Sequence, residues 1–168
     1  FLYRAAGALA AAAILGISVI VSAQVALNIL ARAGGPDWSW TIPSYADFAG
    51  FLLAAATFLA LAHTLRQGVH IRVNLVVQAL PNGLAWAFEV MALSLGIAVA
   101  GAATWFTTGL VEESLHYGDK STGIVAVPLW IPQLPMVFGL ALLTVALLHT
   151  LVDAIIARAP ILKDQGSE

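Results

Sequence analysis

The chain has 168 residues, of which 61% are apolar and only 10% are charged, and its net charge is −2 at neutral pH. Soluble domains average about 45–50% apolar and about 25% charged residues, so this composition excludes a water-soluble fold. The few basic residues form no stripe that could neutralise phosphates, so no nucleic-acid partner is expected. The absence of cysteine excludes disulfides and thiolate chemistry.

The apolar residues come in four long blocks, which predict an all-α membrane protein with a single domain over residues 1–168. Each block is long enough to cross a hydrocarbon core of about 30 Å, which needs about 20 helical residues. We expect spans at about 5–30, 45–65, 83–111 and 130–156, with a connector at 66–82 and a tail at 157–168. Ser44 and Asp47, three residues apart, predict a capping box at the start of the second span.

The first span raises the alternative of a cleaved signal peptide, because Val21-Ser22-Ala23 resembles a small-residue cleavage site. The apolar run continues past that site to Leu30, so we expect an anchored helix instead.

The positive charges predict the orientation in the membrane. With a cytoplasmic N-terminus, five basic residues lie inside and two lie outside, which follows the positive-inside rule and places both termini in the cytoplasm. The inner five are Arg4, Arg66, Arg72, Arg158 and Lys163, and the outer two are Arg32 and Lys120. Most of the tryptophans gather towards the outer interface, as an aromatic belt should.

The connector 66–82 has an amphipathic pattern. At about 100° per residue, His70, Asn74 and Gln78 share one helical face and apolar residues gather on the other. The pattern predicts an interfacial helix whose basic residues meet anionic lipid headgroups. On periodicity alone, a short inner loop with positive-inside charges is an equal alternative.

The connector also carries a motif, which reads Arg66-x-Gly68-x-His70-Ile71-Arg72-Val73-Asn74-Leu75 and ends in Leu80-Pro81. It resembles the signature of the small membrane subunit (DctQ-type) of tripartite ATP-independent periplasmic (TRAP) transporters. The outer regions add to the resemblance with Asp47, Ser121, Pro128 and Trp130. Asp47 supplies an acidic residue where Glu is usual. Two positions depart from the usual pattern: Asn74 stands where Asp is usual, and Thr122 where Pro is frequent.

The resemblance implies a scaffold in the bacterial inner membrane, without catalytic residues, cofactor or metal. Its implied partners are lipids, a large multi-helix membrane subunit with the substrate and sodium sites, and a periplasmic binding protein that delivers an organic acid. The residues that we expect at the large subunit or the inner headgroups are Arg66, Gly68, His70, Arg72, Asn74, Pro81 and Glu89. Asp47, Ser121, Pro128 and Trp130 are the candidate residues on the outer side.

Glu89 is the clearest charged residue inside a predicted span. A charge at the centre of a membrane helix is unfavourable by about 2.5–3.5 kcal/mol on insertion scales, so such a residue needs a role. Glu89 lies about two turns from the inner end of its span, where it can pair with a connector arginine or a partner chain. A proton relay is less favoured because no second acid lies at its depth.

His63 and His149 raise an alternative function, a haem- or quinone-associated membrane anchor of an oxidoreductase. Their depths differ by roughly 9 Å at 1.5 Å per residue, which argues against a shared haem and favours hydrogen bonds between helices. Gln24 and Asn28 lie one turn apart, and we expect them to join two membrane helices.

The remaining groups receive structural interpretations. The small residues of the first span favour close packing against another helix, and they include Gly7, Ala11, Ala12, Ala13 and Gly16. Glu112, Glu113 and His116 are expected in a solvated acidic turn of the outer loop, not in a metal site.

Overall fold

The computed structural model describes residues 1–67 and 81–157. Its elements are α1 (Leu2–Gly34), η1 (Pro36–Trp38), α2 (Tyr45–Arg66), α4 (Asn82–Tyr117) and α5 (Trp130–Ala157). These four α-helices are long and apolar enough to cross a membrane, which confirms an all-helical protein with four candidate spans. The interfacial helix stays a prediction, because Gly68, His70, Arg72 and Asn74 lie outside the described residues.

Two of the helices are much longer than a membrane crossing requires. With 33 and 36 residues, α1 and α4 measure about 50 and about 54 Å at 1.5 Å per residue. A hydrocarbon core of about 30 Å accommodates such helices only if they tilt or project into the headgroup layers. Because α4 continues to Tyr117, Glu112 and Glu113 are exposed residues on its last turns, and the expectation that they lie in a loop is wrong.

Local sequence explains where α1 and α4 end. Gly35 and Gly118 both have positive φ, 79° and 68°, and their amide groups bond back to the helices that they terminate. Glycine adopts this region without the steric penalty of a Cβ atom. Pro81 precedes α4, and its carbonyl accepts bonds from the amides of Leu84 at 2.9 Å and Ala85 at 3.0 Å. Proline is well suited there because the first residues of a helix need no amide donor.

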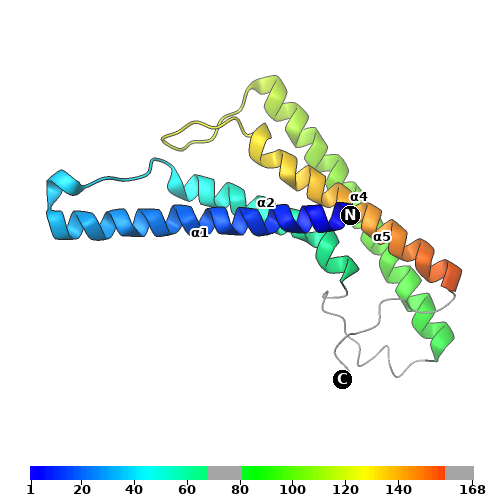
Figure 1. The fold of residues 1–168 in the computed structure, drawn as a ribbon. Coiled ribbons are helices and arrows are strands. Elements are labelled where there is room, and N and C mark those ends of the chain that lie inside the picture. Colours follow the sequence, from blue (N-terminus) through cyan, green and yellow to red (C-terminus); the bar gives the residue numbers. More distant parts are fainter. Residues whose placement is uncertain (68–80, 158–168) are drawn as a thin grey trace, which may run out of the picture.

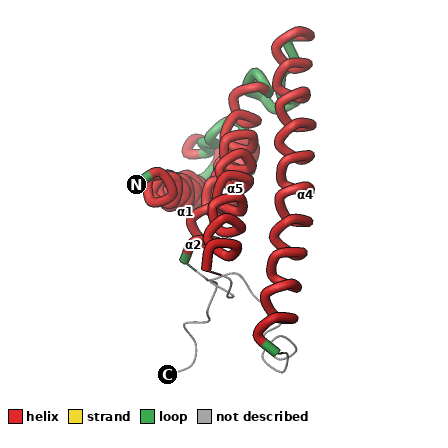
Figure 2. The backbone as a smooth tube through the Cα atoms, turned by 90° about the vertical axis from the view of Figure 1, so that its right-hand side faces the viewer, coloured by secondary structure: helices red, strands yellow, loops and turns green. Residues whose placement is uncertain are grey.

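The helices form two antiparallel pairs that cross each other, as Figures 1 and 2 show. Helix α1 packs along α2, α4 packs along α5, and the pairs meet where α2 lies against α5. The order across the molecule is therefore α1, α2, α5, α4. Within the described residues, the two pairs pack against each other mainly through α2 and α5.

The core consists largely of small side chains. Its buried members are Ala6, Ala62, Leu65, Leu93, Ala100, Leu142, Ala146, Leu147 and Ala154. A Cβ atom at Gly139 of α5 would overlap the carbonyl group of Phe58, so the backbones of α2 and α5 are in close contact there. Small residues permit this approach between membrane helices, where dispersion contacts stabilise packing.

The glycines of α1 pack as the sequence predicts. A Cβ atom at Gly7 would lie 2.8 Å from ring atoms of His63, and one at Gly16 would lie 3.1 Å from Leu52, both on α2. Ala11 and Ala12, in contrast, are exposed. The contact with α2 therefore follows one stripe of small residues, and the rest of α1 is left for lipid or other protein.

Candidate functional site

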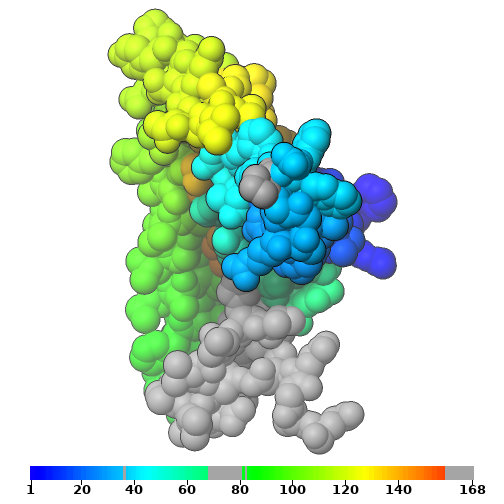
Figure 3. Space-filling model, turned by 90° about the vertical axis from the view of Figure 1, so that its left-hand side faces the viewer, coloured from blue at the N-terminus to red at the C-terminus, as the bar shows by residue number. Residues whose placement is uncertain are grey.

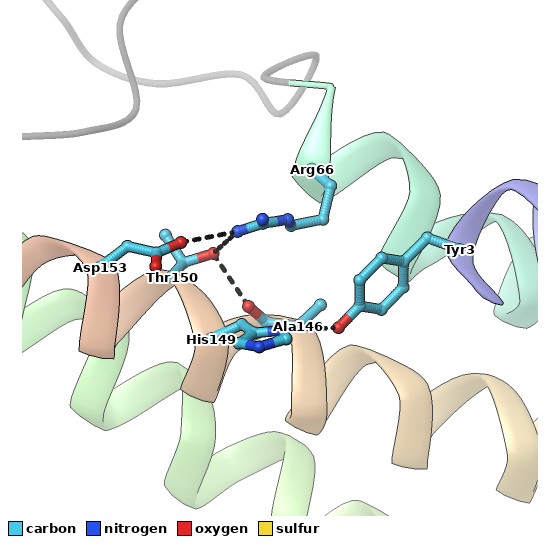
Figure 4. Close-up of polar contacts among 6 residues, drawn as sticks. All are labelled: Tyr3, Arg66, Ala146, His149, Thr150 and Asp153. Atoms are coloured by element: carbon cyan, nitrogen blue, oxygen red, sulfur yellow. Dashed lines mark hydrogen bonds and ion pairs between the residues drawn. The ribbon is translucent and has the colours of Figure 1, made fainter. Parts of the chain in front are cut away.

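Arg66, the last residue of α2, reaches across to α5 (Figure 4). Its Nη1 donates to Oδ2 of Asp153 at 3.1 Å and to Oγ1 of Thr150 at a longer 3.5 Å. Thr150 is fully buried, and its hydroxyl donates to the carbonyl of Ala146 at 2.8 Å. We call Arg66, Thr150 and Asp153 the inner clamp, because they join the helix ends that we predict to face the cytoplasm.

The inner clamp gives Arg66 a partner within its own chain. Its guanidinium pairs with Asp153, and the expectation that Arg66 also faces a partner subunit or headgroups stays a prediction. Its partner Asp153 was missed, although it lies inside the predicted span 130–156. The available signal was topological: spans two and four end on the same side of the membrane, so opposite charges at those two ends are placed to meet.

Two further hydrogen bonds connect α1 and α4 to α5, near the end of α5 that we predict to face the cytoplasm. The hydroxyl of Tyr3 on α1 lies 3.3 Å from Nδ1 of His149, the interhelix bond expected of that histidine (Figure 4). On the other side, Nε1 of Trp86 on α4 donates to the carbonyl of Ala154 at 2.9 Å. Helix α5 is thus bonded to α1, α2 and α4 within its last three turns.

At the other end of the helices, which we predict to be the outer side, residues 119–128 form a hairpin held by Ser121. The Ser121 amide donates to the carbonyl of Val127 at 2.8 Å, and the Val127 amide donates back to the Ser121 hydroxyl at 3.0 Å. The same hydroxyl contacts the carbonyl of Val125 at 3.3 Å, and Lys120 and Pro128 form a β-bridge. One serine side chain therefore closes the hairpin.

The tip of this hairpin is seated on the start of α2, where Figure 3 shows the two segments in contact. The Ser44 hydroxyl accepts a bond from the Val125 amide at 2.9 Å. A Cβ atom at Gly123 would lie 2.6 Å from that hydroxyl and would overlap the carboxylate of Asp47. We call Ser44, Asp47, Gly123 and Val125 the outer clamp.

The outer clamp overturns the predicted capping box. Ser44 precedes α2 but makes no side-chain capping bond, and it has φ 54° and ψ 25°, the left-handed region. That region is uncommon for residues with a Cβ atom. The hydroxyl bonds to the hairpin instead. This contact joins residues far apart in the chain, and it replaces the local capping bond that serine often makes at the start of a helix.

The family of tripartite ATP-independent periplasmic transporters, DctQ component, matches residues 17–157. The chain belongs to this family. The resemblance noted in the connector is thereby confirmed, and a DctQ protein is the small subunit of a TRAP transporter in the inner membrane. No match was found among curated proteins or among solved structures.

The family-motif residues of this DctQ chain divide between its two ends. Ser121 and Pro128 lie in the outer hairpin, Trp130 begins α5, and Asp47 lies against the hairpin tip, so the four outer candidates gather in one region. Of the inner candidates, Arg66 lies in the inner clamp.

Glu89 of this DctQ chain is 6% exposed and lies on one face of α4 with Ala85 and Leu93, four residues to either side. Leu93 belongs to the core that α4 shares with α5, so this carboxylate is on the packed side of the helix. Arg72, one connector arginine expected to pair with it, lies outside the described residues.

Gln24 holds a loop in the DctQ chain, and the expectation that it joins two helices is wrong. Its side chain is 3% exposed, and Oε1 accepts a bond from the amide of Ile42 at 2.8 Å. Its Nε2 donates to Oδ1 of Asn28 at 3.0 Å, which orients the amide group. The pair therefore fixes the loop between α1 and α2 against the outer part of α1.

Proposed function

We propose that this chain is the scaffold subunit of a TRAP transporter, packed against a large membrane subunit. In this proposal, the large subunit carries out sodium-coupled uptake of an organic acid that a periplasmic binding protein delivers. The family match over residues 17–157 is the observation that carries the proposal.

The helices support a scaffold in preference to a solute pathway. Substrate sites of secondary transporters typically combine interrupted helices with converging polar groups near the middle of the membrane. Here α1, α2, α4 and α5 each run unbroken, and the clamps lie at the helix ends. In the most apolar stretch of α1 only 11% of residues are buried, against 28% in α5, so α1 has the larger surface available for lipid or a partner.

Co-purification tests the partnership directly. When the chain is expressed with an affinity-tagged large subunit from the same transporter, we expect the two to elute together through size exclusion in a mild detergent. A tagged large subunit from a different TRAP system is the control and should retain less of the chain. A chain that elutes alone from its own large subunit would contradict the proposal.

We also infer that both termini face the cytoplasm, as the charge asymmetry supports. The chain has no cysteine, so single replacements report on one site each. A membrane-impermeant thiol reagent added to whole cells should label Thr122→Cys in the hairpin and spare Gln67→Cys at the end of α2. The reverse pattern would refute this orientation.

A further inference from the structure

We propose that the inner and outer clamps together fix the crossing angle between the α1–α2 pair and the α4–α5 pair. The chain is then a rigid brace whose shape is set by polar contacts at both ends of one helix crossing. The brace deepens the scaffold role, and its meaning for transport rests on the proposed function. The contacts themselves lie within one chain and can be tested without a partner.

Contacts at the ends of the crossing matter because helix packing alone leaves a range of crossing angles. Gly139 allows the backbone of α5 to touch that of α2 at Phe58, which makes this contact a natural centre of rotation. Packing of side-chain ridges into grooves favours certain crossing angles but leaves a scatter of about 15–20° around them. Groups that lie away from Gly139 can narrow this range, because a given rotation moves them furthest.

Both clamps lie far enough from the pivot to resist rotation. Along α2, Arg66 is about 12 Å from Phe58 in one direction and Ser44 is about 21 Å in the other, at 1.5 Å per residue. A rotation of about 5° would move Ser44 by about 2 Å, which is enough to break a hydrogen bond with a normal limit of about 3.2 Å. The bond between Ser44 and Val125 is 2.9 Å long, so it is intact only near the observed angle.

The outer clamp also has two local features that a free loop would not require. Ser44 adopts left-handed backbone angles without gaining a capping bond, and its hydroxyl is used for the hairpin. Gly123 provides the space that the Asp47 carboxylate occupies. Strained positions persist where surrounding contacts determine them, so these features support a specific docked geometry for the hairpin.

Distances between the two helix pairs test the proposal. Spin labels on Ser22→Cys of α1 and Thr108→Cys of α4, both exposed residues in the outer halves of their helices, report the angle in full-length protein in lipid nanodiscs. Ser44→Ala removes one oxygen atom of the outer clamp, and Gly123→Ala forces the hairpin away from Asp47. Gly50→Ala is the matched control, because a Cβ atom there meets nothing within 4 Å.

We expect both clamp variants to broaden the distance distribution and Gly50→Ala to leave it unchanged. Amide exchange supplies a second measurement: Ser44→Ala should accelerate exchange at Val125 about fivefold, the equivalent of one hydrogen bond of about 1 kcal/mol. Exchange at Val127, which bonds to Ser121 inside the hairpin, should not change.

An unchanged distance distribution combined with faster exchange at Val125 would overturn the proposal, because the hairpin would then open without any change of angle. Exchange at Val125 in Ser44→Ala that is no faster than in the unchanged chain would also overturn it, because the Ser44 hydroxyl would then not hold the hairpin. Both measurements use the chain alone, so they distinguish failure of the brace from failure of the partnership with a large subunit.

Discussion

The ion pair between Arg66 and Asp153 should contribute measurably to the free energy of unfolding. The two charged atoms are 3.1 Å apart, and the two side chains are 37% and 42% exposed. Exposed ion pairs contribute about 0.2–1 kcal/mol, because water and salt screen the charges. The additional contact with buried Thr150 restricts Arg66, so we expect a coupling energy near the upper end, about 1 kcal/mol.

The two single variants should differ in severity. Arg66→Met leaves the Asp153 carboxylate without its cation near the membrane interface, and we expect a loss of about 1–2 kcal/mol in the free energy of unfolding. Asp153→Asn retains an oxygen acceptor, and the freed arginine can extend towards headgroups. We therefore expect Asp153→Asn to cost less than about 1 kcal/mol.

A double-mutant cycle in reversible detergent unfolding measures the coupling. The control cycle combines Arg66→Met with Asp119→Asn in the outer hairpin, at the other end of the molecule, and should give additive losses. The reasoning is refuted if the losses in the free energy of unfolding caused by Arg66→Met and Asp153→Asn are additive, as those of the control cycle should be. It is also refuted if Asp153→Asn is the more damaging variant.

Two more variants test the close contacts. Gly139→Ala introduces a Cβ atom into the Phe58 carbonyl and should destabilise the fold by about 1–3 kcal/mol, whereas Gly109→Ala in open space should have little effect in the same unfolding assay. Equal stability of both would contradict the close approach of α2 and α5. Gln24→Leu removes the acceptor for the Ile42 amide and should cost about 1–3 kcal/mol, with faster exchange of that amide as the direct measurement.

The helices were predictable because the membrane imposes strict conditions on the sequence. A segment in lipid must satisfy its own backbone hydrogen bonds, so long apolar blocks become helices with little dependence on their neighbours. Gly7 and Gly16 could be assigned to a packing face from their size, because small residues let membrane helices approach closely. The helix ends were less predictable, and α4 extends past the predicted end at Val111 to Tyr117.

The clamps were not predictable, because each depends on residues far apart in the chain. Ser44 and Asp47 have the spacing of a capping box, but the hairpin amide of Val125, 81 positions away, bonds to the Ser44 hydroxyl. Asp153 is 87 positions from Arg66 and becomes meaningful only once α2 and α5 are known to be neighbours. Sorting the basic residues by side of the membrane placed Arg66 on the inner side but did not identify Asp153 as its partner.

Uptake in proteoliposomes tests the central claim, that this chain is the scaffold subunit of a TRAP transporter, most directly. Vesicles would contain the large subunit with or without this chain, with the binding protein, a labelled organic acid and an inward sodium gradient supplied outside. We predict uptake only when both membrane subunits and the sodium gradient are present. Equal uptake by the large subunit alone, or uptake by this chain alone, would contradict the claim.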